Sequence, residues 1–166
     1  MAFILITLVV SALGLFVCLN SVSPRPEFAP LLTDPDDPLM IEAEEKARSS
    51  LDAFFELFEK FPDHALVKLY FVSNTEQVEH LWAEVIEREG EENLRVRLVT
   101  PPVTHKGQLD RLYTCTLSDI EDWAVQDDSN NIYGGYSERA MFKIAEREGV
   151  VLPKKLMSRK NLYRDP

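Results

Sequence analysis

Residues Ser118–Tyr136 read SDIEDWAVQDDSNNIYGGY, and this acidic and aromatic run decides the fold that we predict. A buried indole removes about 150 to 250 Å² from water, so Trp123, together with Ile120, is expected to anchor a sheet. The indole N–H needs an acceptor when it is buried. We expect Asp119 or Asp122 to be that acceptor.

The second half of the run predicts a loop that leads into a helix. The turn-forming residues 127–131 indicate an exposed loop. Gly134 and Gly135 give the backbone the freedom to reverse direction. Ser137 is then expected to cap a helix that reaches Glu148, with Gly149 as its terminator.

Four apolar segments that precede this run are predicted to be strands. Residues 66–72, LVKLYFV, are short, apolar and aromatic. Residues 78–88 fit a helical stripe and also alternate as a strand does, and the alternating residues 94–98 beyond a glycine turn favour a hairpin. Residues 109–117 give a fourth strand, in which Cys115 is expected to point into the fold as a small hydrophobic residue.

A helix is predicted over residues 38–61. Asp37 can accept from the first backbone amides of this helix, and Pro38 needs no donor at its first position. Apolar side chains recur at spacings of three and four, and Pro62 ends the pattern. The predicted fold class is α+β: an antiparallel sheet of four to five strands flanked by an N-terminal and a C-terminal helix, plus one N-terminal transmembrane helix.

Residues 1–22 are predicted to be a transmembrane anchor or a signal peptide. The first 19 residues carry no charge and are just long enough to cross about 30 Å of hydrocarbon as a helix. No Lys or Arg precedes the apolar run, which favours an uncleaved single-pass anchor over a signal peptide. Arg25 favours a soluble domain that faces the cytoplasm. The alternative is a secreted or periplasmic protein after signal cleavage.

Two further segments flank the predicted domain at 38–149. Residues 23–37 are rich in proline and are interpreted as a linker. Residues 150–166 form a basic C-terminal tail, which we expect to be solvated and mobile. Residues 1–149 hold 13 basic and 27 acidic side chains, a net charge of −14, so no nucleic-acid partner is expected.

The order of several short motifs along the chain also resembles that of a known family. The strand sequence VKLYF, the segment EHLW, and above all SDIEDWAV and YGGYSERA occur in this order between residues 38 and 149. In this respect the chain resembles the YegJ-like family of bacterial domains of unknown function. The resemblance implies the α+β fold given above, and it implies no activity, cofactor or catalytic residue.

For function, we predict a membrane-anchored, non-catalytic protein-binding module. Acidic side chains flanked by aromatic ones suit a basic protein or peptide, and the membrane itself is the other expected partner, through residues 1–22. The alternative is an enzyme with its site in the loop at 118–136, where Cys115, Asp122 or a histidine would converge in a cleft. The candidate binding residues are Asp119, Asp122, Trp123, Asp127, Asp128, Tyr133, Gly134, Gly135 and Tyr136.

No catalytic, cofactor or metal-binding residue is predicted. The acidic loop does not follow a calcium-binding pattern, because Ile132 stands where the sixth residue, counted from Asp127, should be glycine. His64, His80 and His105 lack the spacing of zinc ligands.

Overall fold

The computed structural model describes residues 34–72, 78–100 and 111–166. The predicted anchor at 1–22 and most of the predicted linker at 23–37 lie outside the described residues, as does His105. Within the described part of the chain, no helix has both the length and the apolar composition that a membrane crossing requires.

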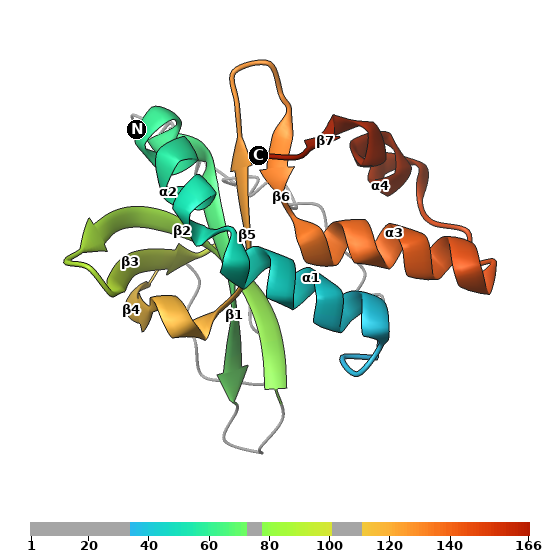
Figure 1. The fold of residues 1–166 in the computed structure, drawn as a ribbon, viewed down its shortest axis with the longest axis horizontal. Coiled ribbons are helices and arrows are strands. Elements are labelled where there is room, and N and C mark those ends of the chain that lie inside the picture. The colour runs from blue at the N-terminus through green and yellow to red at the C-terminus, as the bar shows by residue number, and fades with distance from the viewer. Residues whose placement is uncertain (1–33, 73–77, 101–110) are drawn as a thin grey trace, which may run out of the picture. The chain divides into compact units, whose positions relative to one another are not determined.

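Helices and strands combine into an α+β fold, as predicted (Figure 1). The helices are α1 (Pro38–Ser49), α2 (Leu51–Lys60), α3 (Tyr136–Glu148) and α4 (Lys154–Arg159), with 3₁₀ turns η1 (Pro62–His64), η2 (Leu117–Asp119) and η3 (Lys160–Leu162). The strands are β1 (Ala65–Val72), β2 (Val78–Glu89), β3 (Asn93–Leu98), β4 (Leu112–Thr116), β5 (Ile120–Gln126), β6 (Ile132–Gly134) and β7 (Tyr163–Arg164).

The sheet is larger than predicted and is mixed. Within the described residues, seven strands follow the order β4-β3-β2-β1-β5-β6-β7. All neighbours are antiparallel except β6 and β7, which are parallel. The first four strands match the four predicted segments. The prediction of four to five purely antiparallel strands is wrong, because β6 and β7 are too short to show an alternating pattern.

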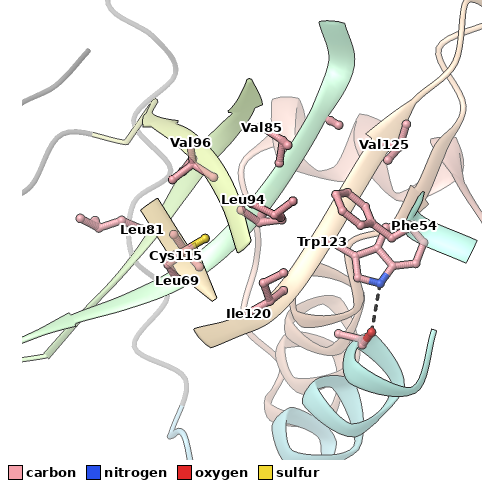
Figure 2. Close-up of a cluster of buried hydrophobic side chains, with 14 of the residues drawn as sticks. Phe54, Leu69, Leu81, Val85, Leu94, Val96, Cys115, Ile120, Trp123 and Val125 are labelled. Atoms are coloured by element: carbon pink, nitrogen blue, oxygen red, sulfur yellow. Dashed lines mark hydrogen bonds between the residues drawn. The ribbon is translucent and has the colours of Figure 1, made fainter. Parts of the chain in front are cut away.

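The connection between β4 and β5 shows that the sheet is curled. These strands lie four positions apart in the sheet, which is about 19 Å in a flat sheet at a spacing of 4.7 to 4.9 Å. The four steps from Thr116 to Ile120 span at most about 14 Å, even when fully extended. The strands from β4 to β5 therefore wrap around the core, and Leu94, Cys115 and Ile120 belong to the same buried cluster (Figure 2).

Helices cover one face of this sheet. Both α1 and α2 pack on β5, and α1 also packs along α3. The predicted single helix over 38–61 is wrong, because it is broken at Ser50. The Ser50 hydroxyl donates to the backbone oxygens of Lys46 (2.7 Å) and Ala47 (3.2 Å), a competing bond that serine offers at a helix end.

The C-terminal segment is folded. Gly149 ends α3 in the left-handed conformation, as predicted, and the chain then forms α4, η3 and β7. Tyr163 of β7 pairs with Ile132 of β6, and its ring packs against Phe142 at 6.1 Å. The expectation of a solvated, mobile basic tail is wrong, because residues of this segment form α4, η3 and β7, Leu152 is buried, and Tyr163 packs against Phe142.

Candidate functional site

The first half of the run at 118–136 is a strand of the sheet. Ile120–Gln126 forms β5, which lies between β1 and β6 and buries Ile120, Trp123 and Val125 completely. Asp119 precedes this strand at the end of η2. Its carboxylate accepts from the backbone N–H and the hydroxyl of Thr116, both at 2.8 Å, so it caps that turn.

Trp123 is the central side chain of the core that the helices cover. Its ring lies 5.6 Å from that of Phe54 and 5.8 Å from that of Tyr136. The indole N–H donates to the backbone oxygen of Ala47 and to the hydroxyl of Ser50, both at 3.1 Å. The prediction that Asp119 or Asp122 accepts this hydrogen bond is wrong. The acceptors come from the break between α1 and α2, more than 70 residues earlier.

Asp122 has a different role, because it caps α3 from the neighbouring strand. Its carboxylate accepts from the backbone N–H of Trp123 (2.8 Å), Tyr136 (3.1 Å) and Ser137 (2.7 Å), and from the Ser137 hydroxyl (2.6 Å). A negative charge is favourable at a helix N-terminus. Gly135 occupies the N-cap position, so the prediction that Ser137 caps the helix is wrong.

Burial also shifts the pKa of Asp122. Only 1% of the residue is exposed, and this burial raises the pKa of its carboxyl above the ordinary value. The hydrogen bonds from Ser137 and the charge of Lys68 act in the opposite direction. All four groups that contact the carboxylate are donors to it, so the group serves as a structural acceptor.

Gly134 and Gly135 are required by space as well as by backbone conformation. Both have positive φ, +75° and +61°. A Cβ on Gly134 would lie 2.3 Å from the backbone oxygen of Trp123, and one on Gly135 would lie 2.5 Å from the Tyr163 ring. The glycine pair therefore lets the chain turn against Trp123 into α3, in line with the predicted reversal.

The segment at 127–131 is the tip of the β5–β6 hairpin. The Asp127 carboxylate accepts from the backbone N–H of Ser129 (2.9 Å) and Asn131 (2.8 Å), and from the Asn131 side chain (2.9 Å). The Tyr133 hydroxyl lies 3.4 Å away. These bonds hold the pKa of Asp127 below its ordinary value. Asp127 therefore builds the turn, whereas Asp128 at the tip is exposed.

Other acidic side chains lie at the same end of the sheet as Asp128. Ala65 pairs with Val125, so the end of α2, η1 and the hairpin tip lie together. The turn between β2 and β3 also lies near α2, because the Arg88 guanidinium stacks over the Phe55 ring of α2 at 4.1 Å. We call this region the acidic end; its exposed carboxylates are Glu56, Glu59, Asp63, Glu91, Glu92 and Asp128.

Among the described residues, those of the enzyme alternative do not meet in either of the two cavities described below. Cys115 is buried on β4, and burial raises the pKa of its thiol to about 11, so the nucleophilic thiolate is disfavoured. His80 contacts Glu121 at 2.7 Å. The two best-defined cavities of the described residues lie between α1 and α3 and between α3 and α4, and neither is lined by Cys115 or Asp122. Those described residues also hold no group of three His, Cys, Asp or Glu side chains that is arranged for a metal ion.

Sequence reasoning found Asp128 but missed the rest of the acidic end. Glu56 and Glu59 read as the polar face of a helix, and Glu91 and Glu92 as an ordinary turn. Only the strand order places these three segments together. No signal within any one segment reports that arrangement.

The fold and the acidic end define a small α+β domain with a curled mixed sheet and a charged surface at one end. A model of the family described as "Uncharacterized protein conserved in bacteria (DUF2314)" matches residues 37–149, and the chain belongs to this family. This match supports membership of a bacterial family of uncharacterised domains and does not confirm the narrower YegJ-like label. Comparisons with curated proteins and with solved structures found no match.

Proposed function

We propose that this domain is a non-catalytic protein-binding module that holds a cationic protein or peptide against its acidic end. The observation that carries the proposal is the strand register, which brings the hairpin tip to the same end of the sheet as α2 and η1. Exposed carboxylates from four separate segments then lie at one end of the sheet. Such a surface attracts a basic partner and repels an acidic one.

The roles of the remaining acids in the run support a binding function over catalysis. Asp119 caps η2, Asp122 caps α3 and Asp127 builds the hairpin turn. Glu121 contacts His80 at 2.7 Å. An enzyme at this stretch would need one of these carboxylates for proton transfer, yet each is engaged by donors of the fold. Asp128 is the acid of the run that stays available to a partner.

The proposal also includes the location of the module in the cell and its assignment to a narrower family. An apolar anchor at residues 1–22 would keep the domain at a membrane on the cytoplasmic side, so that the partner is captured there. Signal cleavage would instead release it as a secreted or periplasmic protein. We keep the YegJ-like assignment as part of this proposal, on the motifs DIEDW and YGGYSER.

Charge removal at the acidic end tests the binding proposal. The triple variant Glu56→Gln, Glu59→Gln and Asp128→Asn leaves Asp127 in place, because that residue builds the turn. The probe is a fluorescent peptide rich in Lys and Arg, titrated with the full chain. We expect the affinity to fall by about tenfold, because charges at the rim of an interface act together on binding.

A matched variant removes the same charge elsewhere. Asp36→Asn, Glu45→Gln and Glu146→Gln change three exposed acids away from the acidic end. This variant should keep the affinity within about threefold, since exposed charges farther than about 10 Å are screened at 0.1 M salt. Equal losses in both variants would mean that the peptide responds only to net charge, and the proposal would fail.

A further inference from the structure

A cleft of about 330 Å³ between α1 and α3 combines basic and apolar side chains. Lys46 of α1 and both Arg139 and Lys143 of α3 line it, together with the ring of Tyr136. Two acids, Glu42 and Asp165, also line the cleft. Glu42 pairs with Lys46 at 2.6 Å and Asp165 pairs with Arg139 at 2.7 Å, and Lys143 adds a third cation beside these two pairs.

Arg139 is the central group of this cleft. Its Nη2 atom donates to Asp165 Oδ1 at 2.7 Å, and its guanidinium carbon lies 5.6 Å from the centre of the Tyr136 ring. Its Nη1 atom is buried and has no hydrogen-bond partner among the described residues. A buried donor without an acceptor is costly, and a guanidinium can bind a carboxylate through two parallel N–H groups. Arg139 therefore has unused capacity for a further acceptor.

Asp165 already places one carboxylate on this guanidinium. The Asp165 side chain is 83% exposed and contributes a single oxygen to Arg139. Arg139 and Lys46 lower the pKa of Asp165, so both cations favour an ionised carboxylate at this position. Because the side chain is so exposed, it can swing away without unpacking the core. Asp165 thus acts as an internal carboxylate that a ligand can replace.

We propose that the cleft between α1 and α3 binds a small organic carboxylate on Arg139, with Asp165 as an intramolecular competitor. Once Asp165 has swung away, the ligand's carboxylate would pair with both terminal nitrogens of Arg139, and Lys143 would add positive charge beside it. Leu39, Ala43 and Ala140 supply an apolar wall for its carbon chain. A volume of this size lies at the lower end of the range for ligand sites, about 300 to 1,000 Å³, which suits a compact molecule. This site is independent of the acidic end and goes beyond the function proposed above.

Isothermal titration of the full chain with succinate tests the site. Wild type should bind succinate saturably. Asp165→Ala should bind it about threefold more tightly or better, because the competing carboxylate is removed. Arg139→Gln should lose about tenfold or more of the affinity, because a charge-assisted pair is replaced by a neutral side chain. Arg95→Gln removes an exposed arginine on β3 and should leave the affinity unchanged.

The variant Asp165→Ala distinguishes a binding site at Arg139 from an ion pair that is only structural. If Arg139 and Asp165 only stabilise the fold, Asp165→Ala will not bind succinate more tightly, and the proposal is overturned. If Arg139→Gln does not fold by circular dichroism, Lys143→Gln replaces it and should weaken binding by about threefold. Titration with inorganic phosphate is the last arm. Binding of phosphate without binding of succinate would overturn the assignment of a carboxylate ligand.

Discussion

The strand β5 and the hairpin tip that follows it each carry two acidic residues, but the fold places these acids in opposite environments. Both are rich in acidic residues, yet β5 lies between two strands and buries Asp122, whereas the tip exposes Asp128. Asp122 receives four hydrogen bonds from the start of α3 and from its own strand. An acidic run in a sequence therefore indicates function only after each of its carboxylates has been assigned to the hydrogen-bond donors around it.

The largest expected effect concerns the close approach of β6 to Trp123. Gly134→Ala should lower the free energy of unfolding by about 3 kcal/mol, because the new Cβ overlaps the Trp123 backbone at a positive φ. Gly90→Ala is the matched control, since Gly90 has the same φ of +75° with nothing within 4 Å. It should lower that free energy by only about 1 kcal/mol. Urea unfolding measures both, and equal losses would show that backbone strain alone explains Gly134.

A smaller effect separates the two aspartates. Asp122→Asn should lower the free energy of unfolding by about 2 kcal/mol, because an amide offers N–H groups to donors that need an acceptor. Asp128→Asn should change it by less than about 0.5 kcal/mol, since its side chain is exposed at the hairpin tip. Urea unfolding at neutral pH gives both values. A similar loss for both variants would contradict the division of the run into a buried and an exposed part.

The smallest effect is a pH dependence of opposite sign at Asp127 and Asp122. The folded-state pKa of Asp127 is lowered from 3.8, so its contribution to stability is present above that pH and is lost as the pH falls through the folded value. Burial raises the pKa of Asp122, so its contribution is greater below the folded value and declines as the pH rises through it. On acidification the difference between wild type and Asp127→Asn should shrink, and that between wild type and Asp122→Asn should grow. Urea unfolding curves of the three proteins between about pH 6 and pH 3 measure these differences. Parallel trends for the two variants would contradict the predicted opposite signs.

Local patterns in the sequence were sufficient for the meander and for α3. A short apolar and aromatic run identifies β1. Alternation alone leaves residues 78–88 open between helix and strand, and the alternating residues 94–98 beyond the glycine turn decide for the hairpin of β2 and β3. Gly149 marks the end of α3, because a left-handed residue there favours glycine. Burial of Cys115 follows from the same alternation on β4.

The features that could not be predicted depend on hydrogen-bond partners that lie far away in the sequence. The acceptors of the Trp123 indole are at Ala47 and Ser50, and the cap of α3 is Asp122 on a neighbouring strand. Three acids just before and within the first half of β5 obscure its strand pattern in the sequence. Each of these acids has a separate partner in the fold. The acidic end and the Arg139 cleft both depend on elements that meet only in the folded chain. A single sequence does not contain these pairings in any local window.

The curl of the sheet also protects the protein from aggregation. An exposed sheet edge offers unpaired backbone groups to another chain, and long flat edges are the most dangerous. Here the two edge strands are β4, with five residues, and β7, with two. The curl bends the β4 edge round toward the start of β5, and a charged arginine ends β7. A chain whose central strands are apolar thereby presents little straight edge on which a second copy could add a strand.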